Sequence, residues 1–425
     1  MKGGKAMSES CYMCIDLKKF YASAECAARG LDPNTTDLVV ADESRGKGAI
    51  CLAVSPAINK KGVKNRCRLY EIPDTLDYII AKPRMRMYMN ISAHIYGIYK
   101  KFVAAEDVYP YSIDEVFLNA APYLSLYKMT PKEFANAIID KIMEETGITA
   151  TAGIGTNMFL AKVALDITAK HVPNHIGVLD EQTFKETLWH HQPITDIWGI
   201  GSGTANRLAH FGVFDLEGIT HIPKATMYRT FGKNAEILID HAYGREPCTL
   251  ADVQNYQSKT RSLSNSQVLF KDYSYSGARL ILKEMVDSLT NELVGQAMYT
   301  DHVSLYIRYS NDVIAPTGGS KKLKQHTNSY KDISEIILTI YDRTTNRGHG
   351  IRQIGISYGD LVYEHCEQLS FFKDDLKAQK EQQLLHAVSV IKDRFGKNAV
   401  LRGMSYQEDS TARVRNGLIG GHCSG

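Results

Sequence analysis

The chain has 425 residues, of which 44% are hydrophobic and 23% charged, and its formal net charge is +3 at pH 7. This length allows about two to four domains, and the composition is typical of a soluble globular protein. No apolar run is long enough to span a membrane and the N-terminal segment lacks a signal-peptide core, so we expect a cytoplasmic location. A charge this close to neutral does not by itself indicate a nucleic-acid-binding protein.

The first 180 residues alternate predicted strands and helices around one sheet. Residues 11–16 form an apolar run that predicts a buried strand ending in Asp16, and a helical pattern follows it. Two further strands are predicted within residues 37–55. A helix is predicted between its capping residue Thr130 and the terminating Gly147. Beyond it, ITATAGIG predicts a strand and NMFLAKVALDITAK a helix.

The segment VYPYSIDEVFLN (residues 108–119) places two adjacent carboxylates, Asp114 and Glu115, among apolar residues. Neighbouring side chains of a regular strand point to opposite faces, so both acids can face one ligand only if the chain turns at residues 112–114. Converging carboxylates repel each other, and a metal ion is the usual compensation. With Asp16 at a neighbouring strand end, the set is the minimum for two hard cations bound through oxygen.

Cys11 and Cys14 have the spacing of half a zinc knuckle. No second pair occurs at matching spacing, and positions three apart on a strand face opposite sides. Packing in the core is therefore the favoured interpretation of this pair.

The pattern changes near residue 190, where a glycine-rich turn separates two short helical patterns. A dinucleotide-binding fingerprint would need a third glycine at the position that Thr204 occupies. Helix–hairpin–helix is the better interpretation, because backbone N–H groups around Gly199, Gly201 and Gly203 could then bind a phosphate. A capped helical turn without a ligand remains the alternative.

Three further regions follow. Residues 249–260 are polar and predict a linker without regular structure, whereas residues 261–363 predict strand–helix–strand–strand–helix–strand, a separate α+β domain. The basic runs GSKKLKQH and RTTNRGHGIR in that domain are interpreted as solvated loops, which would indicate nucleic-acid binding only if other evidence placed them on one groove. A charged amphipathic helix is predicted to end near Phe395, and the glycine-rich residues 415–425 are predicted to be disordered.

The motifs IDLKKFYASAE, YSIDEVFL, GIGTNMFLAKVA and IWGIGSGTANRL, in this order, resemble those of the Y-family translesion DNA polymerases, in particular the bacterial UmuC/DinB-like branch. The resemblance covers nearly the whole chain. It implies a multidomain α+β and α/β protein, a right-hand polymerase with palm, fingers, a helical thumb and an α+β little finger. The implied boundaries are 1–19 and 85–177 for the palm, 20–84 for the fingers, 178–248 for the thumb, 249–260 for the linker, 261–363 for the little finger and 364–425 for the tail.

The activity that the resemblance implies is low-fidelity, template-directed DNA synthesis past damaged bases, in DNA repair and the SOS response. It implies two-metal nucleotidyl transfer from dNTP substrates, with two Mg²⁺ ions, or Mn²⁺ as an alternative. Asp16, Asp114 and Glu115 correspond to the catalytic metal ligands, joined by the backbone carbonyl of Leu17. Tyr21 corresponds to the steric gate, whose ring would clash with the 2′-OH of a ribonucleotide.

The residues that bind the triphosphate are less well matched. Many relatives carry a tyrosine and an arginine three apart on the phosphate-binding helix, where this chain has Pro56 and Asn59. Lys170 corresponds to a lysine that contacts the triphosphate, but its spacing from Lys162 is one residue longer than usual. The implied triphosphate-binding residues are Phe20, Tyr21, Ser55, Asn59, Lys60 and Lys170.

The pentapeptide QLSFF in the polar tail resembles the peptide with which bacterial polymerases bind the sliding clamp. Its residues are Gln368, Leu369, Ser370, Phe371 and Phe372. The expected partners are therefore primer–template DNA and the clamp, with SOS accessory proteins allowed as further partners. We expect a monomer without membrane contact.

Two other classes of protein share some of these features. A nucleotide cyclase also uses paired acids on a hairpin, but it has no duplex to hold, which the predicted helix–hairpin–helix and little finger argue against. A non-catalytic DNA-binding or clamp-binding scaffold would not need the intact acids Asp16, Asp114 and Glu115. Primer extension with each acid changed to alanine separates the three.

Overall fold

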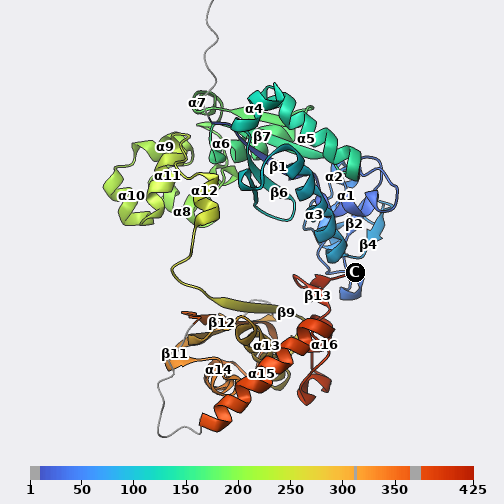
Figure 1. Ribbon diagram of the computed structural model, residues 1–425, viewed down its shortest axis with the longest axis vertical. Helices are drawn as coiled ribbons and strands as arrows, with labels where there is room; N and C mark the ends of the chain where they lie inside the picture. The colour runs from blue at the N-terminus through green and yellow to red at the C-terminus, as the bar shows by residue number, and fades with distance from the viewer. Residues whose placement is uncertain (1–9, 311–313, 364–374) are drawn as a thin grey trace, which may run out of the picture. The chain divides into compact units, whose positions relative to one another are not determined.

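The computed structural model describes residues 10–310, 314–363 and 375–425. The chain forms two compact units, of which the first comprises the residues up to Tyr256 together with Gly425, and the second comprises Gln257–Ser424 (Figure 1). Within the part of the chain that is described, no helix is long and apolar enough to cross a membrane.

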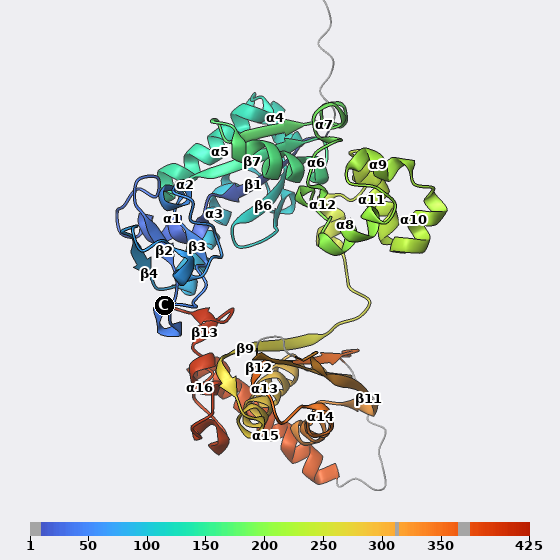
Figure 2. The same cartoon turned by 180° about the vertical axis from the view of Figure 1, so that it is seen from behind.

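A five-stranded sheet with the order β5-β6-β1-β7-β8 forms the centre of the first unit (Figure 2). Its middle strand β1 (Tyr12–Leu17) is antiparallel to both β6 (Glu115–Asn119) and β7 (Ala150–Gly155). At the sheet edges, β5 (Val108–Pro110) is antiparallel to β6 and β8 (Ile176–Leu179) is parallel to β7. The first strand, which carries Asp16, is thus the buried centre of the sheet.

Helix α5 (Pro131–Thr146) packs on β7 and begins and ends as the sequence predicts. The Thr130 side chain accepts from the backbone N–H of Glu133, the Glu133 side chain accepts from the backbone of Thr130, and Gly147 ends the helix with φ +69°. Helix α6 (Met158–Val163) is capped by the side chain of Asn157 and packs on β1 and β7. Helix α3 (Met85–Phe102) packs on α5, and α4 (Ala121–Tyr127) follows β6.

Between β1 and α3 lies a second, smaller sheet with the order β3-β2-β4. The two strands predicted within residues 37–55 are present as β2 (Leu38–Val40) and β3 (Ala53–Val54), and β4 (Ile79–Ala81) is parallel to β2. Helix α1 (Phe20–Ala27) packs against β2 and β3, and α2 (Pro56–Lys60) follows β3.

A helical subdomain ends the first unit, and two details differ from the sequence prediction. The helix predicted before the glycine turn is only a 3-10 turn, Ile194–Asp196. Residues predicted as an unstructured linker form α12 (Leu250–Asn255), because Thr249 and Asp252 make a capping box and Leu250 is buried. The other helices here are α7 (Glu181–Leu188), α8 (Ser202–Ala209), α9 (Leu216–His221), α10 (Lys224–Phe231) and α11 (Asn234–Ala242).

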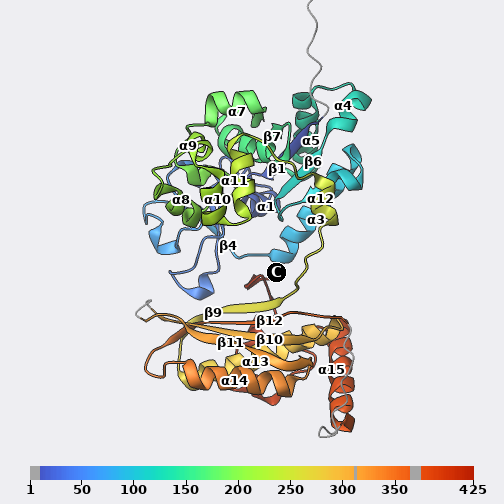
Figure 3. The same ribbon diagram turned by 90° about the vertical axis from the view of Figure 1, so that its left-hand side faces the viewer.

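The second unit has the predicted strand–helix–strand–strand–helix–strand order. Its antiparallel sheet has the order β11-β10-β12-β9, and Figure 3 shows α13 and α14 on one face of that sheet. The basic run KKLK, predicted as a loop, lies on the edge strand β11 instead. The elements are β9 (Leu263–Tyr273), α13 (Tyr275–Gly295), β10 (Thr300–Tyr309), β11 (Thr317–Thr327), α14 (Tyr330–Thr344) and β12 (Ile351–Gly359).

Residues 415–425 form regular structure, so the prediction of disorder for them is wrong. The predicted tail helix is present as α15 (Asp375–Phe395), and strands β13 (Leu418–Ile419) and β14 (His422–Cys423) pair as a hairpin. Gly420 and Gly421 connect these strands with φ +57° and +81°, the two positive values that a tight hairpin turn requires. The glycines therefore serve a specific turn.

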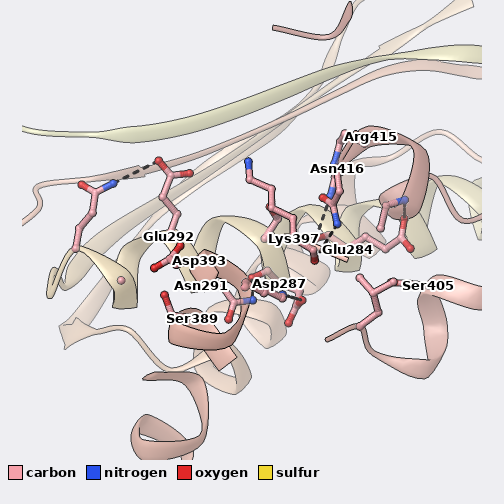
Figure 4. Close-up of a pocket in the computed structure, with 16 residues that line it drawn as sticks. Glu284, Asp287, Asn291, Glu292, Ser389, Asp393, Lys397, Ser405, Arg415 and Asn416 are labelled. Atoms are coloured by element: carbon pink, nitrogen blue, oxygen red, sulfur yellow. Dashed lines mark hydrogen bonds and ion pairs between the residues drawn. The ribbon is translucent and has the colours of Figure 1, made fainter. Parts of the chain in front are cut away.

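A buried carboxylate attaches this tail to α13 (Figure 4). Glu284 is 2% exposed and accepts hydrogen bonds from Ser410 Oγ (2.6 Å) and the backbone N–H groups of Thr411 (3.0 Å) and Ala412 (3.1 Å). Arg415, in the helix α16 (Ala412–Arg415), donates to Gln267 Oε1 on β9 at 3.1 Å. Every one of these polar groups is satisfied inside the second unit.

Candidate active site

The predicted hairpin of acids is present at the end of β1. Asp16 lies directly opposite Glu115 in the β1–β6 register, and the N–H of Leu17 donates to the carbonyl of Asp114 at 2.9 Å. The backbone N–H of Ser112 donates to the carbonyl of Glu115 at 3.0 Å, which closes the turn. This turn brings two consecutive acids to the end of the same central strand.

A cavity of about 580 Å³ opens beside this turn, a volume within the range of small-molecule sites. The predicted site residues that line it are Asp16, Leu17, Phe20, Tyr21, Asn59, Asp114 and Lys170. The further basic residues that line it are Lys18, Lys19, Arg66 and His171.

Asp16 is a carboxylate whose ionised form is poorly stabilised. Burial raises the pKa of Asp16 to about 7; the positive charge of Lys170 opposes that rise, and the charges of Asp114 and Glu115 add to it. The nearest cation is Lys170 Nζ, 3.7 Å from Asp16 Oδ2. A bound divalent cation would supply the missing positive charge, so Asp16 and Asp114 fit a Mg²⁺ site.

Glu115 is held differently from the other two acids. Its side chain is 10% exposed and forms an ion pair with Lys162, whose Nζ also lies 2.9 Å from Asp166 Oδ2. Burial favours neutral Lys162, but the hydrogen bond to Glu115 and the negative charges of Asp166 and Glu115 together outweigh burial, so the pKa of Lys162 is raised. Glu115 does not line the cavity, and within residues 10–310, 314–363 and 375–425 no group of three acidic, histidine or cysteine side chains is arranged around one metal position. Glu115 could join such a site only if its pair with Lys162 opened.

Cys14 is a neighbour of this pair. Its Sγ lies 3.6 Å from Glu115 Oε1, and both Cys14 and Cys11 are buried, which agrees with the core-packing interpretation.

Tyr21 lines the cavity from α1 and is held by a network that the sequence analysis missed. Its ring stacks on Tyr88 at 4.6 Å and 20°, and Tyr88 Oη donates to Glu25 Oε1 at 2.7 Å. Glu25 is fully buried and accepts from Arg84 Nε and Nη2 at 3.0 and 2.7 Å. Burial would raise the pKa of Glu25, but the hydrogen bonds from Arg84, Arg29 and Tyr88 outweigh it and lower that pKa. A lone acid four residues after Tyr21 in a helix of small residues was the available signal.

The unusual spacing of Lys170 has a structural explanation. Ala164–Thr168 form a π-helical turn, in which hydrogen bonds span five residues instead of four. Such a turn absorbs one extra residue within a helix, so Lys170 still lines the cavity although it lies one position further along the chain. Its Nζ is 2.7 Å from Asp166 Oδ1.

Ser55 is a wrong prediction. It is fully buried, and its Oγ donates to the carbonyl of Thr36 at 2.7 Å and accepts from the N–H of Leu38 at 3.1 Å. Its second role is to cap α2 through the N–H of Ile58. The side chain has no access to a nucleotide.

Three other residues predicted to bind the triphosphate have positions that limit this role. Phe20 is 3% exposed, so its ring belongs to the core although the residue borders the cavity. Lys60 is exposed but does not line the cavity. Asn59 does, yet its Nδ2 donates to the carbonyl of Val63 at 2.9 Å.

The glycine turn presents an open helix start. Gly199 has φ +87°, Gly201 precedes α8 without a side-chain cap, and a Cβ added at Gly201 or Gly203 would meet nothing within 4 Å. The first backbone N–H groups of α8 are therefore accessible to an anion. The predicted clamp peptide, residues 368–372, lies outside the described residues.

Comparison with known proteins agrees with this geometry. The model of the impB/mucB/samB family matches residues 15–166, and the model of that family's C-terminal domain matches residues 260–371. The chain is 31% identical over 418 residues to UvrX of Bacillus subtilis (strain 168), whose name assigns it to UV-damage repair, covering 97% of both chains. It is 29% identical over 427 residues to DNA polymerase IV 2 of the same organism, covering 98% of this chain and 99% of the relative.

A solved structure has a similar fold. The Y-family DNA polymerase chimera Dbh-Dpo4(243-245)-Dbh superposes with a TM-score of 0.65 at 22% identity, covering 83% of this chain and all of the chimera's (100%). Mixed helices and sheets in palm, fingers, thumb and little finger are thus the architecture of this fold.

Proposed function

Because this chain belongs to the Y family of translesion DNA polymerases, we propose that it adds nucleotides by two-metal nucleotidyl transfer, with Asp16 and Asp114 as the acids that hold the cations. The observation that carries this proposal is the cavity shared by Asp16, Asp114, Tyr21 and Lys170. When bound, divalent cations lower the pKa of an attacking hydroxyl and neutralise charge on the leaving pyrophosphate. Mg²⁺ is the proposed metal, since both acids offer hard oxygen ligands.

The protein's own side chains divide the remaining tasks. Glu115 would offer a third carboxylate to the cations if its ion pair with Lys162 opened, and Leu17 would offer its backbone carbonyl. Lys170 donates to the triphosphate of the incoming dNTP, at the cavity wall where its Nζ already faces Asp16. Tyr21 excludes ribonucleotides, because its ring is fixed by the stack on Tyr88 and fills space beside the acids.

Primer–template DNA is the proposed macromolecular substrate. The uncapped start of α8, at Gly201 and Gly203, binds a backbone phosphate through N–H groups and so accepts any base sequence. The basic side chains of β11 add phosphate contacts from the second unit. Binding that rests on phosphates weakens steeply with salt.

Primer extension on paired templates tests this function. One template is undamaged and the other carries an abasic site, and both are copied with dNTPs and Mg²⁺. The wild type is expected to extend past the abasic site, and the single variants Asp16→Ala and Asp114→Ala are expected to extend neither template while still binding DNA. Extension by either variant at the wild-type rate would refute the assignment of the acids.

We also propose that residues 368–372 bind a bacterial sliding clamp and that the protein acts in the SOS response. The support is the sequence QLSFF, whose three large apolar side chains fit an apolar pocket. Changing Leu369, Phe371 and Phe372 together to alanine is expected to remove clamp stimulation and leave unclamped extension unchanged. The control Ser370→Ala alters the same peptide without removing an apolar contact, and persistent stimulation of the triple variant would contradict the proposal.

A further inference from the structure

Helix α2 and the loop after it form one wall of the cavity. This wall has few hydrogen-bond donors for an anion. A triphosphate presents only hydrogen-bond acceptors and negative charge. Pro56 has no N–H, Ser55 donates its hydroxyl to the carbonyl of Thr36, and Asn59 donates its amide to the carbonyl of Val63. These three residues leave at most one amide N–H of Asn59 for a ligand, so a positively charged donor on this wall must come from another residue.

Arg66 is the basic side chain on that wall. It is exposed and lines the same cavity as Asp16, Asp114 and Tyr21. No carboxylate in the described part of the chain forms an ion pair with it, whereas Lys170 already shares its charge with Asp16 and Asp166. The guanidinium of Arg66 has five N–H donors and no anionic partner, so it is suited to bind an anion that enters the cavity.

The backbone around Arg66 is fixed in an unusual conformation. Its φ is +63°, in the left-handed region that side chains other than glycine rarely adopt. The N–H of Arg66 donates to the carbonyl of Cys51 at 3.0 Å, and the side chain of Asn65 accepts from the N–H of Val54 at 3.1 Å. Both bonds anchor the loop to the small sheet, so the strained residue is held at the cavity edge by its neighbours.

We propose that the Arg66 guanidinium binds the triphosphate of the incoming nucleotide. The proposal rests on the proposed function, because it takes this cavity as the nucleotide site. Guanidinium and phosphate form paired, charge-assisted hydrogen bonds that an ammonium cannot reproduce in the same geometry. Arg66 thus provides the donors that Ser55, Pro56 and Asn59 do not.

Single-nucleotide insertion kinetics test this role. Arg66→Gly removes the side chain and suits the positive φ, so the loop keeps its conformation. The KM for each dNTP is expected to rise about tenfold or more, by a similar factor for all four bases, with a smaller change in kcat. The KM of Arg66→Lys is expected to lie between the values of the wild type and Arg66→Gly. The Kd for primer–template DNA is expected to stay unchanged in both variants. Lys64→Ala, which removes an exposed charge two residues away that does not line the cavity, is the control.

Several outcomes would overturn the proposal while the polymerase assignment stands. An unchanged KM in Arg66→Gly would do so, as would a KM shift equal to that of Lys64→Ala. A weaker Kd for DNA with an unchanged KM would place Arg66 on the template strand. A KM effect that differs among the four dNTPs would indicate contact with a base. Failure of the proposed function would look different, since the wild type itself would then show no Mg²⁺-dependent insertion.

Discussion

Asp16 at the end of β1 and Glu284 in α13 are both carboxylates that the fold removes from most of the solvent, one in each compact unit. Glu284 accepts three hydrogen bonds, two of them from backbone N–H groups of the tail. Asp16 has a single lysine at 3.7 Å, and burial raises its pKa to about 7. The same chemical group is thus satisfied by the protein in one region and left in need of a cation in the other.

This contrast separates structural acids from functional ones. A buried charge with a complete set of partners holds the fold together, whereas one without them costs stability and persists where a ligand completes it. Glu25, with partners on Arg84 and Tyr88, is of the first kind although it lies near the cavity.

Loss of an acid that lines the cavity is expected to have the largest effect. In Asp114→Ala, the rate of primer extension should fall roughly a thousandfold or more, about 4 kcal/mol or more of transition-state stabilisation. Affinity for DNA should be unchanged or higher, because the acid repels phosphate. Extension near the wild-type rate would remove Asp114 from the site.

Loss of the satisfied acid should damage the fold and spare the chemistry. Glu284→Ala leaves the N–H groups of Thr411 and Ala412 without their acceptor and should destabilise the tail by about 2–3 kcal/mol. Hydrogen exchange at these two amides should accelerate, while the insertion rate of the folded protein is retained. Unchanged protection would show that the tail is held by other contacts.

Tyr21, the proposed steric gate, is expected to have a smaller effect. Tyr21→Ala should reduce discrimination against ribonucleotides by about tenfold or more, equivalent to about 1.4 kcal/mol, because the ring no longer occupies the space of the 2′-OH. Tyr88→Phe is the control, since it keeps the ring that stacks on Tyr21 and loses only the hydrogen bond to Glu25. Equal discrimination in the wild type and Tyr21→Ala would make Tyr21 a packing residue only.

The smallest effect concerns acid stability near the cavity. The folded-state pKa of Glu25 lies below its ordinary value of 4.5, so its stabilising contribution is fully present above pH 4.5 and is lost as the pH falls through the lowered value. The difference in Tm between the wild type and Glu25→Gln should therefore shrink on acidification from pH 7. A difference that stays constant down to pH 3 would contradict this role.

Local sequence patterns predicted many of the helices, strands and turns of the fold. The capping box at Thr130, the alternation of the strands and the turn before Glu115 depend on neighbouring residues, so they could be predicted in advance. The hairpin at Gly420 was missed because glycine enrichment is compatible with both disorder and a tight turn, and only the paired strands decide between them.

The rest depends on contacts between residues distant in sequence. Nothing local to Ser55 shows that Thr36 and Leu38 would take its hydroxyl, and nothing near Glu115 shows that Lys162 would pair with it. The π-helical turn that brings Lys170 to the cavity appears in the sequence only as an odd spacing. Glu25 gave a signal, but its partner Arg84 lies 59 residues away.

Counting bound metal ions tests the central claim most directly. The full chain, with primer–template DNA and a non-hydrolysable dNTP analogue, would be titrated with Mn²⁺ and followed by electron paramagnetic resonance. The account predicts two bound ions per chain for the wild type and for Glu284→Gln, and fewer for Asp16→Asn. Equal binding by Asp16→Asn and the wild type, or loss of binding in Glu284→Gln, would contradict it.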